Sequence, residues 1–218
     1  HAALTVQEWD DDPLHWEDHF QQSQFIEFRS AHAIQTSTPA LAEYLRQFNP
    51  EVRIFPNCIA TLPPLRLETG PVATIFFGAL NRKADWEPIL PAFNRVVAAY
   101  RGRVRVIVVL DREFFDAVEC PEKRFVPFCP YPQYQEWLRQ SDVALLPLLP
   151  TRFNRMKSDL KFIECAAGGA VALANPTVYA DTIEHGKTGW LYESAEQFEQ
   201  GLARLLDDQA LRHQLAKN

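Results

Sequence analysis

The chain has 218 residues, of which 47% are hydrophobic and 23% are charged, and its formal net charge is -6 at pH 7. These values are ordinary for a globular protein, and the length allows one large or two small domains. The acidic balance argues against a general nucleic-acid-binding protein, which carries a basic excess, so any anion binding must be local.

The cysteines and the hydropathy pattern indicate the compartment. Cys58, Cys120, Cys129 and Cys165 form no C-x-x-C pair, so we expect reduced thiols rather than a disulfide framework or a zinc site. No apolar run approaches the roughly 20 residues of a membrane span, and no signal-peptide pattern stands at the N-terminus. We therefore expect a cytoplasmic protein without a transmembrane segment, and peripheral association with a membrane stays open.

The first 60 residues have the pattern of a short α/β segment. Strands are expected over 4–9, 32–36 and 52–56, and helices over 14–30 and 37–48. Thr38 followed by Pro39 predicts a capped start for the second helix. Three strands are few for a doubly wound domain, whose sheet has about five or six. Residues 61–70 are proline-rich and aperiodic, which predicts a linker.

Beyond residue 70 strands and helices alternate more regularly. Strands are expected over 72–77, 104–110, 124–127, 143–146 and 170–174, and helices over 85–100, 113–119, 132–140, 156–167, 194–206 and 209–217. Repeated βα units with helices on both faces predict a Rossmann-like parallel sheet. We therefore expect an incomplete N-terminal α/β domain over 1–60 and a larger α/β domain over 71–218.

Ligands of open α/β sheets bind beyond the carboxyl ends of the strands, and the loop after strand 72–77 is one candidate. There Gly78 allows the backbone to approach a ligand closely, and Arg82 and Lys83 can neutralise phosphate. The alternative is a turn with two solvated cations. A later loop over 175–180 either frames the same site with polar groups or is an ordinary proline turn.

The helix expected over 156–167 would place Lys157, Lys161 and Glu164 at i, i+4 and i+7 on one face. The helix N-terminus, with Lys157 and the hydroxyl of Ser158, suits phosphate. Glu164 lies two turns deeper, where a carboxylate is better matched to ribose hydroxyls. The alternative is a charged helix face held by its own ion pairs.

The acidic run over 10–12 has three open interpretations. Its aspartates could hold Mg²⁺ or Mn²⁺ with a nucleotide diphosphate, cap the next helix, or line a cleft without metal. The sequence shows no second carboxylate cluster. We therefore assign no metal ligands.

Three segments in order, DVALLP at 142–147, ECAAGGAVALA at 164–174 and IEHGKTGWL at 183–191, resemble the motif series of one family. They are similar to the C-terminal, donor-binding domain of GT-B fold glycosyltransferases, in particular the retaining glycosyl transferases group 1. Segments 37–45 and 52–57 resemble the end of that family's N-terminal domain. The resemblance extends from about residue 32 onward.

The resemblance implies a partial N-terminal, acceptor-side domain and a nucleotide-sugar donor-binding domain, so we expect a piece of a longer protein. The implied activity is that of a hexosyltransferase in polysaccharide or glycoconjugate biosynthesis. It would transfer a sugar from a UDP-, GDP- or dTDP-sugar to a glycan or another acceptor, with retention. No cofactor or metal would be required.

The resemblance also assigns residues. Glu164 matches a signature glutamate that holds the ribose, and Lys157, Glu164 and Arg82 are the expected catalytic residues. A branch with the pattern FNRxKSxxKxxE matches residues 153–164 most closely. The expected donor-binding residues are Gly78, Asn81, Arg82, Lys83, Asn154, Lys157, Ser158, Lys161 and Glu164.

Two positions depart from the family pattern. Met156 stands where the family has a glutamate that contacts the donor sugar, and Ala79 replaces an arginine of the phosphate loop. These departures keep a second interpretation open, a non-catalytic or truncated module that binds a nucleotide sugar or a protein partner. A third is a metal-dependent transferase that uses Asp10, Asp11 and Asp12.

Overall fold

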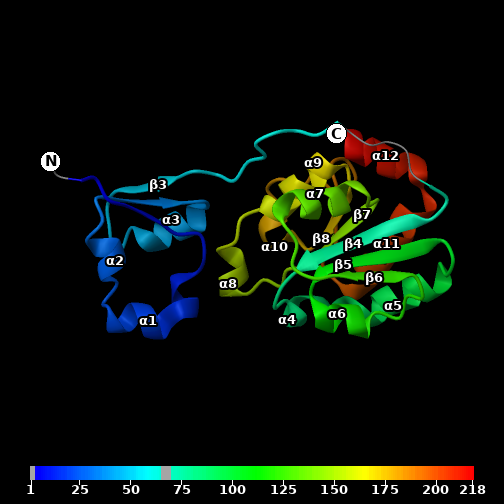
Figure 1. Cartoon of the computed structure of the whole chain (residues 1–218), viewed down its shortest axis with the longest axis horizontal. Coiled ribbons are helices and arrows are strands. Elements are labelled where there is room, and N and C mark those ends of the chain that lie inside the picture. The colour runs from blue at the N-terminus through cyan, green and yellow to red at the C-terminus, as the bar shows by residue number, and fades with distance from the viewer. Residues whose placement is uncertain (1–2, 65–69) are drawn as a thin grey trace. The chain divides into compact units, whose positions relative to one another are not determined.

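The computed structural model describes residues 3–64 and 70–218, and the chain divides into two compact units (Figure 1). Unit 1 comprises His1–Cys58 and Pro150–Leu160, and unit 2 comprises Ile59–Leu149 and Lys161–Asn218. Residues 65–69 of the predicted linker lie outside the described residues. Within the described ranges, no helix is long and apolar enough to cross a membrane.

Unit 1 contains, in the part of the chain that the structure describes, a parallel three-stranded sheet in the order β1-β2-β3. Its strands are β1 (Val6–Glu8), β2 (Ala33–Thr36) and β3 (Val52–Ile54), and its helices are η1 (Pro13–Trp16), α1 (Glu17–Gln22), α2 (Ile26–Arg29), α3 (Pro39–Leu45) and α8 (Arg152–Arg155). Thr38 caps α3, since its hydroxyl accepts a hydrogen bond from the Leu41 amide at 3.2 Å, and Pro39 opens the helix. The predicted capped start is confirmed.

The single helix predicted over 14–30 is wrong, because the chain forms η1, α1 and α2 there. Gln24 and Phe25 have left-handed backbone angles, with φ of 52° and 57°, which no α-helix continues through. The Phe25 ring stacks on Phe48 with centroids 4.2 Å apart. Packing against a residue far along the chain therefore overrides the local amphipathic pattern.

Unit 2 contains, among its described residues, a parallel six-stranded sheet in the order β6-β5-β4-β7-β8-β9. The strands are β4 (Ala73–Ala79), β5 (Val104–Leu110), β6 (Lys123–Val126), β7 (Val143–Leu146), β8 (Val171–Ala174) and β9 (Trp190–Leu191). The order reverses between β4 and β7, which is the kind of switch point where open α/β sheets bind ligands. The predicted Rossmann-like parallel sheet is confirmed.

Helices cover both faces of this sheet (Figure 1). They are α4 (Lys83–Trp86), η2 (Glu87–Ile89), α5 (Leu90–Ala99), α6 (Arg112–Ala117), α7 (Tyr131–Arg139), α9 (Leu160–Gly168), α10 (Pro176–Tyr179), α11 (Ala195–Asp207) and α12 (Gln209–Lys217). Ile75 and Phe77 of β4 pack in the core with α5, α6 and α11, whereas Phe76 between them packs with α7, α9 and α10. This alternation follows from the two-residue period of a strand.

The helix predicted over 156–167 begins later, at Leu160. Met156 is the C-cap of α8, and its carbonyl oxygen accepts a hydrogen bond from the Thr38 hydroxyl at 3.1 Å. In a continuous helix that carbonyl would accept from the amide of Leu160, which instead contacts the Ser158 hydroxyl at 3.4 Å. Lys157 and Glu164 therefore do not share a helix face, and that part of the prediction is wrong.

Candidate functional site

The buried carboxylates of Asp85 and Asp111 hold together the loops at the carboxyl ends of the central strands of unit 2. Asp85 accepts a hydrogen bond from the Leu149 amide after β7 at 2.9 Å and pairs with Arg82 after β4 at 3.2 Å. Asp111, after β5, accepts from the Trp86 indole at 3.1 Å. Because both aspartates are buried, each with 6% of its residue surface exposed, these loops form a fixed rim beside the switch point.

Four of the predicted donor-binding residues lie between the end of β4 and the start of α4: Gly78 in the strand, Asn81 and Arg82 in the loop, and Lys83 at the start of the helix. Asn81 has a left-handed φ of 56°, a conformation that asparagine tolerates better than most residues, and Arg82 follows with a side chain only 21% exposed against Asp85. Lys83 instead pairs with Glu113 at 3.0 Å on the surface. Of the two predicted cations, Arg82 is the one held in place by a buried group.

Gly78 is required by packing. A Cβ atom built there would lie 2.7 Å from the Phe76 ring and 2.9 Å from the Tyr134 ring, and both distances are shorter than real Cβ contacts. The missing side chain thus allows Tyr134 of α7 to reach the end of β4. The structure gives this glycine a local reason besides close approach of a ligand.

Glu164 is a buried carboxylate on α9, only 6% exposed. The Lys161 ammonium lies 3.4 Å from its Oε2 and donates a hydrogen bond to the Tyr134 hydroxyl at 2.9 Å. Lys161 and Glu164 are neighbours on the helix at i and i+3, as their spacing predicts. Gly78, Lys161 and Glu164 therefore meet around one tyrosine.

The phenols beside Glu164 are kept neutral. Burial raises the pKa of the Tyr134 hydroxyl, and the negative charges that Cys165 and Glu164 would carry raise it further. Burial also raises the pKa of Tyr131, with further contributions from the charge of Glu164 and a hydrogen bond to it. Both hydroxyls remain protonated near neutral pH and can donate to an anionic acceptor.

Glu164 lines a cavity of about 250 Å³ in unit 2. The lining residues are Thr61, Pro63, Pro132, Gln135, Glu136, Arg139, Glu164, Ala167 and Gly168. They come from the segment before β4, from α7 and from α9. The cavity thus offers two carboxylates, Glu136 and Glu164, with an amide, a guanidinium and apolar walls, the mixture typical of small-molecule sites.

Asn154, Lys157 and Ser158 belong to unit 1. The Lys157 ammonium forms an ion pair with Asp11 and lies over the Phe153 ring. The Ser158 hydroxyl accepts a hydrogen bond from the Asn57 amide at 2.7 Å, while Asn154 is 3% exposed. The predicted residues therefore form two groups, one in each unit, and their ligand roles stay predictions.

The acidic run supports the capping alternative at one position. Asp12 is 4% exposed and accepts a hydrogen bond from the Leu14 amide in η1 at 3.1 Å, and its Oδ1 also lies 3.4 Å from Arg152. Asp11 is the partner of Lys157. Among residues 3–64 and 70–218, no group of three or more His, Cys, Asp or Glu side chains is arranged to hold a metal ion.

Sequence reasoning missed the contribution of α7, which supplies Tyr131, Tyr134, Gln135 and Arg139 to the surroundings of Glu164. The signal was present, because α7 follows a predicted strand, and residues beyond the carboxyl ends of strands are candidates by the same rule that selected the loop after β4.

Residues 71–208 match the family model of the glycosyl transferases group 1. The chain belongs to this family. The match runs from just before β4 to the end of α11, and it includes the segment Pro150–Leu160 of unit 1. It confirms the resemblance seen in the three motifs.

Solved structures share the fold. TarM of S. aureus, solved as a mutant in complex with fondaparinux, alpha-GlcNAc-glycerol and UDP, is 12% identical, with a TM-score of 0.71 over 97% of this chain and 45% of that one. WaaG, a glycosyltransferase involved in lipopolysaccharide biosynthesis, is 14% identical, with a TM-score of 0.71 over 99% and 69%. HepE of Anabaena, solved with UDP and glucose, is 17% identical, with a TM-score of 0.65 over 98% and 64%.

The chain thus spans 45% of TarM and 64% of HepE, and both parts of it take part in the likeness because nearly all of its length is covered. No curated protein matches it in sequence.

Proposed function

We propose that the chain is the donor-binding part of a glycosyltransferase that transfers a sugar from a nucleotide sugar to a glycan or another acceptor, with retention and without a metal. Its place in the glycosyl transferases group 1 supports the reaction class. The UDP in the structures of TarM and HepE supports a uridine diphosphate donor.

The observation that carries the proposal is the buried carboxylate of Glu164 at the wall of the cavity of about 250 Å³. A buried carboxylate is costly unless hydrogen bonds satisfy it. The two carboxylate oxygens can accept hydrogen bonds from both hydroxyls of a ribose. Lys161 and the neighbouring tyrosines fix the orientation of the carboxylate. In this role Glu164 holds the nucleoside and does not react.

In the transfer, the bond between the anomeric carbon and the diphosphate oxygen breaks, and its electron pair stays on the diphosphate. The acceptor hydroxyl oxygen forms the new bond to that carbon, and its proton passes to the oxygen of the leaving diphosphate. Fixed cations lower the barrier by stabilising the charge that develops on the leaving group. We assign this role to the cations Arg82, Lys83, Lys157 and Lys161, and polar contacts to the donor to Gly78, Asn81, Asn154 and Ser158.

A second candidate function is a non-catalytic module that binds a nucleotide sugar or a protein partner. The observation that favours it is the position of Met156, where the family's sugar-contacting glutamate would stand. Met156 packs against the apolar cluster of unit 1 that contains Phe28 and Leu41, so this side chain belongs to a core and offers the sugar no carboxylate.

Calorimetric titration with UDP, GDP and dTDP, each with and without EDTA, tests the donor site. We expect binding of UDP that EDTA does not change and that falls about tenfold in Glu164→Gln, because an amide hydrogen then faces a ribose hydroxyl. Glu196→Gln, on the exposed side of α11, is the control. Equal affinity in Glu164→Gln and the parent chain would contradict the assignment.

Turnover separates the two functions. If the chain is part of an active transferase, the whole protein should release UDP from a UDP-sugar in the presence of an acceptor. UDP binding without any release, across a panel of UDP-sugars and glycan acceptors, would favour the module.

A further inference from the structure

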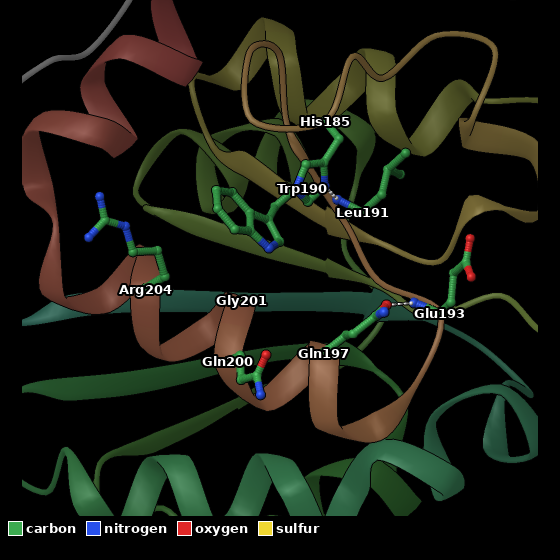
Figure 2. A pocket seen from close by; sticks show the side chains of 8 residues that line it. All are labelled: His185, Trp190, Leu191, Glu193, Gln197, Gln200, Gly201 and Arg204. Carbon is green, nitrogen blue, oxygen red and sulfur yellow. Dashed lines mark hydrogen bonds between the residues drawn. The ribbon is translucent and has the colours of Figure 1, made fainter.

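A groove of about 690 Å³ lies between β9 and α11 (Figure 2). It is lined by His185, Trp190, Leu191, Glu193, Gln197, Gln200, Gly201 and Arg204. It shares no lining residue with the cavity beside Glu164, and β9 stands at one end of the strand order, away from the switch point between β4 and β7. The groove is therefore separate from the proposed donor site.

Trp190 forms the aromatic wall of the groove and is held in a fixed position. A Cβ atom on Gly201 would lie 2.6 Å from the Trp190 indole. Because glycine has no side chain, one edge of the ring packs directly against the backbone of α11. The His185 ring packs beside it, with centroids 4.7 Å apart, and His185 itself accepts a hydrogen bond from the Leu191 amide at 3.1 Å. An ordered ring loses little freedom when a ligand stacks on it.

Opposite the ring, α11 presents planar polar groups. Gln197, Gln200 and Arg204 follow each other at spacings of three and four residues, which places them on one face of the helix. The Gln197 carbonyl oxygen accepts from the Glu193 amide at 2.8 Å, and the Gln200 amide group donates to Glu196 at 3.2 Å. Figure 2 shows these side chains along α11, with Gln197 and Gln200 below Trp190 and Arg204 to the left of the ring.

The lining is nearly balanced in charge. Arg204 pairs with Asp208 at 3.1 Å, and Glu193 is the carboxylate among the lining residues. A diphosphate needs several uncompensated cations, which this groove does not offer within its lining. A polar ligand without charge suits it better.

We propose that the groove binds a neutral saccharide, with the apolar C–H face of one sugar ring on Trp190 and its hydroxyls on Gln197, Gln200 and Arg204. A ring with one apolar face and a rim of hydroxyls matches an aromatic wall facing amides. The volume lies within the range of about 300–1,000 Å³ that small-molecule sites occupy. The groove would hold a glycan away from the site of transfer, and its binding does not depend on catalysis.

The test is saturation-transfer NMR and calorimetry of the chain with three neutral trisaccharides, maltotriose, cellotriose and triacetylchitotriose. We expect at least one of them to bind, and its affinity to fall about tenfold in Trp190→Ala and about threefold in Gln200→Ala. Trp190→Phe, which keeps a ring against α11, should retain part of the affinity. Trp16→Ala removes an exposed tryptophan of unit 1 and serves as the matched control.

UDP affinity, measured in parallel, should be the same in all four variants, so that failure of the saccharide site and failure of the donor site are distinguishable. Circular dichroism and thermal melting check that each variant folds. The proposal is overturned if none of the trisaccharides binds, or if one binds as tightly to folded Trp190→Phe and Gln200→Ala as to the parent chain.

Discussion

Lys161 contacts Tyr134 twice, because its ammonium donates a hydrogen bond to the hydroxyl at 2.9 Å and lies 4.5 Å from the ring centroid. This contact joins α9 to α7, the helices that flank the cavity beside Glu164. Tyr134 is 9% exposed and Lys161 lies 3.4 Å from Glu164. The orientation of the proposed ribose-binding carboxylate therefore depends on a tyrosine of another helix.

Tyr134→Phe should weaken both the fold and the site. The new ring keeps its contact with Phe76, at 5.5 Å between centroids, but Lys161 loses the hydroxyl acceptor and keeps its contact with Glu164 at 3.4 Å. We expect a loss of about 1 kcal/mol in the free energy of unfolding and a UDP affinity lower by about threefold. Urea unfolding and calorimetry measure the two.

The control is Tyr100→Phe, which removes a hydroxyl bonded to Asp207 at 2.7 Å, outside the cavity lining. It should cost stability without changing UDP affinity. Equal UDP affinity in Tyr134→Phe and Tyr100→Phe would show that the Lys161 contact does not position the site.

Gly78→Ala should be destabilising for a steric reason. The added methyl group would lie 2.7 Å from the Phe76 ring and 2.9 Å from the Tyr134 ring, so one ring must move in a packed core. Overpacking of this kind costs about 1–3 kcal/mol, and a displaced Tyr134 should also lower UDP affinity. Gly70→Ala, where nothing lies within 4 Å, should unfold at the same urea concentration as the parent chain. If Gly78→Ala unfolds at the same urea concentration as the parent chain, the Phe76 and Tyr134 rings move aside without a loss of stability, and the steric argument is wrong.

The parallel sheet of unit 2 was predictable because local signals agree. Apolar runs such as 106–109 and 143–146 are buried on both faces, as strands of a parallel sheet are. The cap at Thr38 and the pair of Lys161 with Glu164 also depend on spacing along the chain. By contrast, β9 contains two residues, too few to show a period.

The errors have tertiary causes. The end of α8 at Met156 depends on Thr38, 118 residues away in sequence, and the break at Phe25 depends on Phe48. The partner of Lys157 is Asp11, which local periodicity cannot indicate. In the candidate site, Glu164 could be found from its helix and motif, but its tyrosine neighbours required the packing of α7 on α9.

Cys165 gives a prediction on pH. Burial raises the pKa of its thiol from the ordinary 9.0 to about 12, so the folded chain keeps the proton where the unfolded chain releases it. This contribution to stability is complete below pH 9 and is lost as pH rises from 9 towards 12. The free energy of unfolding should therefore fall with pH in this window.

In Cys165→Ala the fall should be shallower, since one thiol no longer contributes, while Cys58→Ala, which removes an exposed thiol, should follow the parent profile. Iodoacetamide at a pH of about 8.5, near the ordinary pKa of a free thiol, should likewise modify Cys58 well before Cys165, as read by mass spectrometry. Parallel pH profiles in Cys165→Ala and the parent, or early alkylation of Cys165, would contradict the burial argument.

The ion pair between Lys157 and Asp11 allows a test of the catalytic role proposed for Lys157. The side chains are 25% and 32% exposed, so the ammonium is accessible but already has a partner. If Lys157 binds a phosphate of the donor, its ammonium must give up the ion pair with Asp11. The Asp11 carboxylate therefore competes with the phosphate and weakens binding. We expect Lys157→Met to lower UDP affinity about tenfold, the size of a lost hydrogen bond to a charged group. Asp11→Asn, by contrast, should leave the affinity unchanged or raise it.

Lys187→Met, which removes a 63% exposed ammonium paired with Glu184, controls for the loss of one positive charge, and calorimetry at low and physiological salt compares the three. If Lys157→Met binds UDP as the parent chain does while losing stability together with Asp11→Asn, the pair is structural, and the phosphate role rests with Arg82, Lys83 and Lys161 alone.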